Sequence, residues 1–462
     1  MARVTTAREL ADELGDNAFA DERLNRRIRL LTAAIGGNPS ASFPNIFDEP
    51  AELEAAYRFF GNPKVSPEGL LAGHHAALHE RMREEPSLVI HDTTKFVFDD
   101  DGQRVGLGRV MNAGQAFFGH FALVVADDET RSPLGVAGIE YWVRDDKPAD
   151  GRERSRWWNL ANTVSHRMHS TQLIHVMDCE ADDYDLFCRM VDAKHRFVIR
   201  RKSDRNVVCD DGATNKITAV LASAESQAQR RVKLSVRRTA KRNPRAIAKN
   251  PARDARHTTL SVAAKRVSLK RPGSQPTSSP STLAINVVHV WEAEPPEGSA
   301  PVDWVLYTTE SIATPNDVEK IVDRYRARWT IEIFFKALKT GCAVESRQLR
   351  DVSALINATT LFAPIAAMLL LLRAELDRAP DASATTLFTE QQLDVLCMLS
   401  KRPLPERPTV RDVVYAIGRL GGHQPRAETP PGWQTLTKGF AKFDAFARGW
   451  NAAQLQLRCA ER

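Results

Sequence analysis

The pattern of apolar and polar positions divides the chain into helical ends and a strand-rich middle. Residues 1 to about 70 and the residues after Lys339 repeat with the period of helices. Four residues form an apolar face within residues 20–35: Leu24, Ile28, Leu31 and Ile35. Three arginines project away from that face: Arg23, Arg26 and Arg29. A basic face of this kind suits phosphate contacts, and an ordinary solvated face is the equally weighted alternative.

From Ser87 the pattern changes to short apolar runs rich in β-branched residues, which are typical of strands. The run S-L-V-I-H-D-T-T predicts a strand that ends in Asp92, and L-I-H-V-M-D predicts a buried strand that ends in Asp178. We expect His91 to face the opposite side of its strand, and Glu180 and Asp182 to cap the next helix. Further elements are predicted at residues 116–126 and 133–143 (strands completing an antiparallel meander), 156–168 (helix), 182–191 (helix) and 196–200 (strand).

One long helix is predicted over residues 323–341, within a segment that begins at the N-cap Thr314 and Pro315 and stops at Gly341. Helical spacing places four polar side chains in one stripe about 60° wide: Tyr325, Arg328, Glu332 and Lys339. Such a stripe beside an apolar face fits the wall of a site that handles phosphate. A solvated, salt-bridged edge is the plainer alternative.

Two acid-ended strands followed by an acid-bearing helix describe a ribonuclease-H-like fold. We therefore expect an α/β protein whose catalytic core is a mixed sheet flanked by helices, with Asp92, Asp178 and Glu332 brought together by the sheet and the helix across it. The alternative for Asp92 and Asp178 is that each carboxylate caps the element that follows it.

Residues 205–305 exceed what that fold requires. The stretch 230–256 is rich in Lys and Arg, and residues 271–282 are a low-complexity loop rich in Pro and Ser. We predict an inserted β-rich subdomain with a mobile basic loop, and a disordered surface insertion is the alternative. Strands are expected at residues 232–236, 258–262 and 283–291.

The apolar run at residues 355–372 is long enough to be compared with a membrane span. Asn357, Thr359, Thr360 and Pro364 interrupt it, so a buried core helix is predicted and no membrane partner is expected. Helices are expected afterwards at residues 390–399, 409–420 and 432–450.

Composition indicates which kind of partner the protein binds and in which compartment it lies. The 462 residues are 43% hydrophobic and 26% charged, with a net charge of +6 and a pI near 9.0, as in a globular protein with nucleic acid as a plausible partner. The six cysteines are scattered, which indicates reduced thiols and neither disulfides nor a zinc site. The first residues carry acids and lack the apolar core of a signal peptide, so a cytoplasmic, nucleoid-associated location is expected.

Taken together, these motifs resemble the bacterial DDE cut-and-paste transposases of the insertion-sequence-four group. Tyr325, Arg328, Glu332 and Lys339 match the signature Y-x2-R-x3-E-x6-K, and H-D-T-T (91–94) and D-C-E-A-D (178–182) match its two Asp motifs. The resemblance extends nearly end to end, through A-E-L-E-A-A-Y-R-F-F-G-N-P-K-V-S (51–66), K-H-R-F-V-I-R (194–200), W-V-L-Y-T-T-E (304–310) and A-I-G-R-L-G-G (416–422).

The resemblance implies roles for particular residues. Asp92, Asp178 and Glu332 become the acidic, metal-binding triad. Tyr325, Arg328 and Lys339 are implied to hold the phosphate next to the cut. Three more residues are implied to contact DNA: Trp304 by stacking on a flipped base, and Arg200 and Lys202 through the backbone. Trp304 could equally be plain core. The family usually has Arg after the second Asp, and here Cys179 departs from that pattern.

Cleavage and joining of phosphodiesters explain why carboxylates are needed. Two Mg²⁺ ions, for which Mn²⁺ can substitute, activate a poor nucleophile and neutralise charge when they lie about 4 Å apart between bridging carboxylates. The expected partners are double-stranded DNA, as transposon ends and target, and a second copy of the chain in a synaptic homodimer. A hairpin intermediate is expected, because Trp304 would then stack on the extruded base.

The resemblance also implies a domain plan. We expect a helical DNA-binding domain at residues 1–70, a catalytic domain at 71–375 that contains the insertion at about 205–305, and a helical dimerisation domain at 376–462. Two alternatives remain: a catalytically inactive or repurposed copy that only binds DNA, and a stand-alone metal-dependent nuclease.

Overall fold

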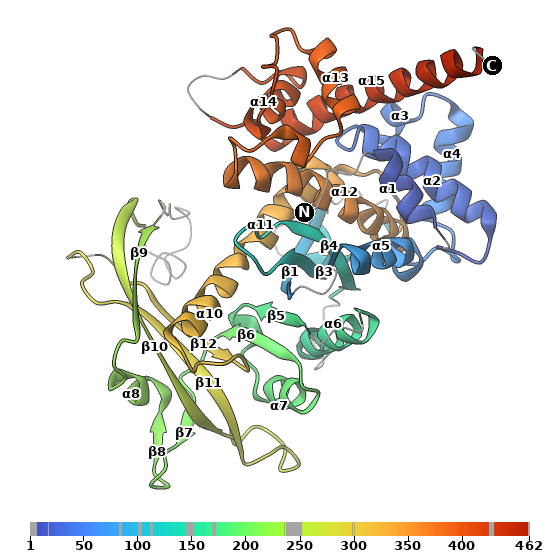
Figure 1. The fold of residues 1–462 in the computed structure, drawn as a ribbon. Coiled ribbons are helices and arrows are strands. Elements are labelled where there is room, and N and C mark those ends of the chain that lie inside the picture. Colours follow the sequence, from blue (N-terminus) through green and yellow to red (C-terminus); the bar gives the residue numbers. More distant parts are fainter. Residues whose placement is uncertain are drawn as a thin grey trace. The chain divides into compact units, whose positions relative to one another are not determined.

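The computed structural model describes most of the chain and divides it into two compact units. The described residues are 7–16, 18–82, 86–99, 104–110, 114–144, 152–168, 172–234, 236, 252–297, 299, 301–424 and 429–460. Unit 1 comprises Met1–Arg156, Asn162–His169 and Trp329–Arg462, and unit 2 comprises Trp157–Ala161 and Ser170–Arg328. Figure 1 shows a mixed α/β protein with helices at both ends of the chain, which is consistent with the predicted ribonuclease-H-like core.

The first part of unit 1 is helical, as predicted. Its helices are α1 (Ala7–Gly15), α2 (Glu22–Gly37), α3 (Phe43–Ile46), α4 (Pro50–Phe60) and α5 (Pro67–Met82). Ile28, Leu31 and Ile35 are buried and Arg23 and Arg26 are exposed, so the apolar face of α2 is confirmed. The sequence did not predict α5, whose buried positions include His74 and His75.

An antiparallel meander follows in unit 1. Strand β1 (Ser87–Asp99) pairs with β3 (Gly114–Ala126), which also pairs with β4 (Pro133–Trp142) and with the short β2 (Gly108–Val110). The predicted end of the first strand is wrong, because Asp92 lies inside β1. The strand continues with a buried Phe96 and Phe98 between exposed neighbours, and this alternation keeps the chain in the sheet.

Helix α12 (Val352–Arg378) forms the centre of unit 1 and packs against β4, α4, α5 and α14. Within the described ranges it is the one helix long and apolar enough to cross a membrane, and 94% of that apolar window is buried. The prediction of a buried core helix is therefore confirmed. The remaining elements are η3 (Val344–Ser346), η4 (Ala384–Thr386), α13 (Glu390–Leu399), α14 (Val410–Leu420) and α15 (Trp433–Ala460).

Unit 2 is built on one mixed sheet. Its strand order is β5-β6-β12-β11-β10-β7-β8, and β9 pairs with β10. The pairing of β5 with β6 is parallel, and the other pairings within unit 2 are antiparallel. The strands are β5 (Leu173–Met177), β6 (Arg196–Arg200), β7 (Asn206–Val208), β8 (Thr214–Lys216), β9 (Ala228–Leu234), β10 (Arg256–Lys270), β11 (Thr282–Glu292) and β12 (Asp303–Thr308).

Strands β9, β10 and β11 confirm the β-rich character that the sequence predicts near residues 232, 258 and 283. They extend the same sheet, because β11 pairs with β12 along its length. Of the two predicted loops, residues 271–282 are described, whereas residues 237–251 lie outside the described part. Four helical elements of the described part accompany the sheet: η1 (Cys179–Ala181), α7 (Tyr184–Asp192), α8 (Ile217–Ala222) and α10 (Pro315–Ala327). Helix α6 (Arg152–Met168) contributes residues to both units.

The predicted long helix over residues 323–341 is not one regular helix. It is divided into α10 (Pro315–Ala327), α11 (Trp329–Lys336) and a π-helical turn η2 (Ala337–Gly341). The break lies at Arg328, whose N–H bonds the Tyr325 carbonyl at 3.1 Å in a tighter turn. The predicted Thr314 cap and the stop at Gly341 are confirmed. The break is also the boundary between the two units.

Candidate active site

Unit 1 carries Asp92 and Glu332 on elements that pack together. Helix α11, which bears Glu332, packs on β1, which bears Asp92. The aromatic ring of Phe121 from β3 anchors this packing, with ring centroids 5.7 Å from Phe334 and 5.5 Å from Phe335. Both acidic residues are partly exposed. The sequence therefore folds so that a strand and a helix present two carboxylates from one packed layer.

Buried polar side chains support the backbone around Asp92. The Asp92 carboxylate accepts a hydrogen bond from the Thr93 N–H at 2.8 Å. The Thr93 hydroxyl lies 3.0 Å from His120 Nδ1 and accepts a bond from the Arg156 Nε–H at 3.2 Å. His91 is buried and stacks on His120 with ring centroids 5.6 Å apart, so its predicted structural position is confirmed.

Lys339 is engaged by groups of unit 1. Its ammonium donates to the Lys95 carbonyl on β1, lies 3.5 Å from the Glu345 carboxylate and sits 5.2 Å from the centre of the Phe96 ring. Burial lowers the pKa of Lys339, and the Glu345 charge acts in the opposite direction. Glu345 also accepts from the Val97 N–H at 2.9 Å. Lys339 is thus held over the strand that carries Asp92.

Unit 2 brings Asp178, Tyr325 and Arg200 together. Asp178 follows β5, as predicted, and caps η1 by accepting from the Glu180 N–H at 2.8 Å. Burial raises the pKa of Tyr325, while hydrogen bonding and charge from Arg200 oppose the rise and the nearby Asp178 carboxylate adds to it. The Tyr325 phenol therefore lies beside the Arg200 guanidinium, and the Asp178 carboxylate lies within electrostatic range of it.

Trp304 lies next to Tyr325 and Arg200 in unit 2. Its half-buried ring meets Tyr325 edge-on with centroids 5.8 Å apart, and the Arg200 guanidinium carbon lies 5.9 Å from its ring centre. The tryptophan is therefore beside the signature tyrosine and does not lie in the buried core. Arg328 is partly exposed at the C-terminal end of α10, and Lys202 is exposed in the loop after β6.

Asp182 does not cap the next helix, contrary to the prediction. Asp183 caps α7, accepting from the Asp185 and Leu186 N–H groups at 2.9 and 3.2 Å. Asp182 instead bonds the loop after β6 and Arg205, which is 23 residues away in sequence. Short-range spacing could not identify that partner.

Two family models match the chain. The model described as transposase DNA-binding matches residues 8–65, and the model described as transposase DDE domain matches residues 83–363, more than half of the chain. The chain belongs to the DDE transposase family. It is a DNA transposase, and DNA is its partner.

The carboxylates of this transposase supply the hard oxygen donors that Mg²⁺ prefers. Among the residues that the structure describes, no three His, Cys, Asp or Glu side chains gather closely enough to hold a metal ion. Asp92 and Glu332 belong to unit 1 and Asp178 to unit 2, so each acid is placed only within its own unit. The triad as a single centre therefore stays a prediction.

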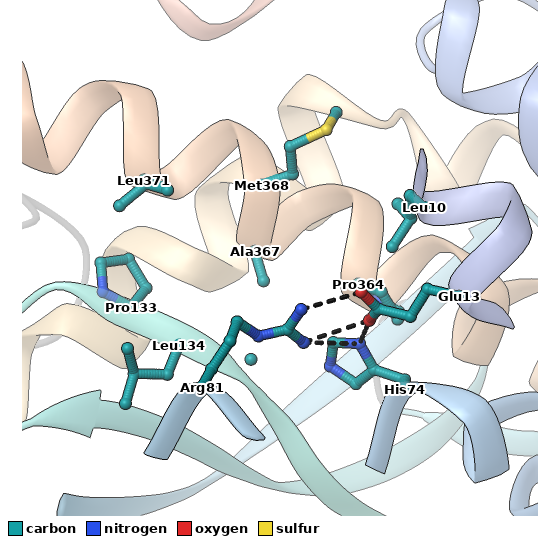
Figure 2. Close-up of a pocket in the computed structure, with 11 residues that line it drawn as sticks. Leu10, Glu13, His74, Arg81, Pro133, Leu134, Pro364, Ala367, Met368 and Leu371 are labelled. Carbon is teal, nitrogen blue, oxygen red and sulfur yellow. Dashed lines mark hydrogen bonds and ion pairs between the residues drawn. The ribbon is translucent and has the colours of Figure 1, made fainter. Parts of the chain in front are cut away.

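A buried polar cluster ties the DNA-binding segment of the transposase to its DDE domain. Figure 2 shows Glu13 from α1 facing His74 and Arg81 from α5, beside a cavity of about 30 Å³. Arg81 donates to Glu13 at 2.8 and 3.1 Å, and the Val136 N–H on β4 donates to His74 Nε2 at 3.0 Å. His74 Nδ1 must then carry the proton that it shares with Glu13.

The electrostatics of this cluster keep Glu13 ionised. Burial raises its pKa, but bonds and charges from His74 and Arg81 outweigh burial and lower the pKa to about 2. Gly135, at φ +154°, is required beside it, because an added Cβ would lie 2.7 Å from His74 Nε2. Sequence reasoning missed this cluster because its bonded pairs are 61 to 68 residues apart in the sequence.

Sequence reasoning also passed over Trp329. Its indole is 56% exposed at the first position of α11, between Arg328 and Glu332. A large exposed aromatic beside the signature residues was the available signal.

Proposed function

We propose that this transposase excises and integrates its mobile element by hydrolysis and transesterification of phosphodiesters, with Asp92, Asp178 and Glu332 as the metal ligands. One observation carries the proposal: each unit separately pairs an acid with a signature residue. In unit 1 the helix of Glu332 packs on the strand of Asp92, and in unit 2 Asp178 lies close enough to Tyr325 to affect its pKa.

The donor set fits a pair of divalent ions. Two Mg²⁺ ions, or Mn²⁺ in their place, would supply charge neutralisation and an activated oxygen nucleophile. Backbone N–H groups orient Asp92 and Asp178, each by a 2.8 Å bond to its carboxylate. A carboxylate fixed in this way loses less side-chain freedom when it becomes a ligand.

Tyr325, Arg328 and Lys339 hold the phosphate beside the cut in this proposal. Arg328 provides the planar fork that matches a phosphate. Lys339 exchanges its bond to the Lys95 carbonyl for a phosphate oxygen, since a bond between two charged groups is stronger than one to a neutral carbonyl. Arg200 and Lys202 contact the backbone. Trp304 stacks on a base flipped out of a hairpin intermediate, because its ring is partly exposed beside Tyr325.

We further propose membership of the insertion-sequence-four group, with similarity to the transposase of transposon Tn-five. Residues 1–70 bind the element ends, 71–375 are catalytic with a β-rich insertion at about 205–305, and 376–462 form the dimerisation domain of a cytoplasmic, nucleoid-associated enzyme. An apolar hollow of about 540 Å³ between α13 and α15 supports the homodimer. Met398 and Phe446, which line it, are 57% and 59% exposed.

Replacement of one acid tests the reaction. Asp178→Ala should abolish Mg²⁺-dependent cleavage of a duplex that carries the inverted repeat flanking the element, while binding to that duplex is kept. The binding is kept because the family match for DNA binding lies at residues 8–65. Cleavage is measured by gel and binding by fluorescence anisotropy.

Asp185→Ala is the matched control, since Asp185 lies on α7 in an exposed pair with Arg189. It should cut at the wild-type rate. If Asp178→Ala still cuts, the triad is wrong. If the wild-type chain binds the end and cuts nothing, the inactive, DNA-binding alternative replaces the proposal.

A further inference from the structure

Asp182 is a buried carboxylate whose hydrogen-bonding capacity is fully used. Its side chain is 0% exposed. One oxygen accepts from the backbone N–H groups of Lys202 and Ser203, at 2.7 and 2.8 Å. The other oxygen accepts from the Arg205 Nε–H at 2.7 Å and forms an ion pair with Arg205 Nη2. Four donors match the four lone-pair positions of a carboxylate, so Asp182 is not available to a metal ion.

These bonds determine the path of the chain after β6. The Arg201 N–H still pairs with the Val305 carbonyl on β12, at 2.8 Å. The next two N–H groups then turn toward one oxygen of Asp182, and the Arg205 guanidinium closes the loop by also donating to the Asp182 carbonyl at 2.7 Å. Consecutive N–H groups directed inward leave the Lys202 residue exposed on the outside of loop 201–205.

The same short turn carries the predicted metal ligand. The Asp182 N–H bonds the Cys179 carbonyl at 3.4 Å, and Asp178 begins the turn by capping it. Asp178 is thus at one end of this turn, and Asp182, which anchors loop 201–205, is at the other end. Arg200, the residue just before this loop, reaches Tyr325 and Trp304.

We propose that Asp182 is a positioning residue for the transposition reaction: it folds loop 201–205 so that Lys202 meets the DNA backbone beside Arg200 and Asp178. The inference rests on the proposed role of Lys202 as a backbone contact. Asp182 itself touches no DNA and acts through the loop.

The experiment measures binding of the full-length chain to its end duplex as a function of salt. Asp182→Asn should weaken binding about tenfold at low salt and reduce the slope of log affinity against log salt by about 0.9, the loss of one phosphate contact. Lys202→Ala should do the same. In the double variant the effects should not add, because both act on one contact. Asp185→Asn, a surface acid three residues away, should bind as the wild type does.

Each outcome decides between the proposals. If Lys202→Ala weakens binding and Asp182→Asn does not, or if the two effects add fully, Asp182 does not position the contact and the proposed function stands. If Lys202→Ala binds like the wild type, the proposed contact itself is wrong and the inference ends with it. Should Asp182→Asn fail to fold in a thermal melt, Arg205→Lys, which keeps the charge and removes the fork, is judged by the same criteria.

Discussion

Asp92 in unit 1 and Asp178 in unit 2 are held by different kinds of backbone. Asp92 lies inside a 13-residue strand that pairs with β3 along its whole length. Asp178 lies just beyond a 5-residue strand and caps a single turn. The strand is supported by a layer of aromatic rings and imidazoles, whereas the turn depends on side-chain bonds such as those of Asp182.

This difference indicates which of the two acids is held rigidly and which can adjust. Every residue of β1 near Asp92 is fixed by sheet pairing, so perturbing it should cost stability of unit 1. The turn at Asp178 and the loop that it anchors contain few sheet bonds, so perturbing them should alter DNA contacts more than folding.

The largest expected effect is a loss of stability that is confined to one unit. Phe121→Ala removes the ring on which Phe334 and Phe335 pack, and a buried Phe-to-Ala change costs about 3–5 kcal/mol. Hydrogen exchange measured by mass spectrometry should speed up in the peptides of unit 1, including α11, and stay unchanged in those of unit 2.

The matched variant is Phe187→Ala in unit 2, where the ring packs on Phe197 and Tyr307 at 6.0 and 5.0 Å. It should give the reverse pattern. Uniformly faster exchange in both variants would contradict the division into two units.

A smaller effect concerns the aromatic contact of unit 2. Trp304→Ala should slow the proposed hairpin step about tenfold or more, because the proposed stacking on a base contributes roughly 1–3 kcal/mol, and should slow the first nick less. Time courses of both steps on one labelled end measure this. Trp304→Phe, which keeps a ring, should recover most of the rate; equal loss in both steps would return Trp304 to a packing role.

The smallest effect tests the buried imidazoles of unit 1. Burial, followed by the charges of Arg167 and His74, lowers the pKa of His75 from 6.5 to about 2. The unfolded chain therefore takes up a proton below pH 6.5 that the folded chain does not bind. Stability should fall as pH decreases below 6.5, by about 1 kcal/mol between pH 6.5 and 5.5 for this group.

Urea unfolding at several pH values between 7 and 5 measures that slope. His75→Gln should flatten it, and His79→Gln, at an exposed position of the same helix, should leave it unchanged. Identical slopes in all three proteins would show that His75 does not contribute.

Local patterns in the sequence predicted the elements that have regular periodicity. The buried strand before Asp178, the helices α2 and α4, the core helix α12 and the helices α13, α14 and α15 followed from apolar spacing and caps. The same reasoning ended β1 too early, because Asp92 interrupts the run although Phe96 and Phe98 continue the alternation.

Features that depend on distant partners could not be predicted in this way. Helix α5 buries His74 because Glu13 and Val136 bond its imidazole, and a polar residue without a known partner is expected on the surface. Asp182 was assigned to the nearest helix because Arg205 is distant in sequence. No Gly or Pro lies at the break at Arg328, so the sequence contains no local signal of it.

The central claim is that Asp92, Asp178 and Glu332 share one metal centre. Fe²⁺ in place of Mg²⁺, with ascorbate and peroxide, cleaves protein backbone close to where the ion is bound, and the fragments of the end-bound transposase are identified by mass spectrometry. A shared centre should give cuts next to all three acids, and all three cut sites should be lost in Asp92→Asn, Asp178→Asn or Glu332→Gln alone. Cuts near one acid that persist when the other two are replaced would contradict it.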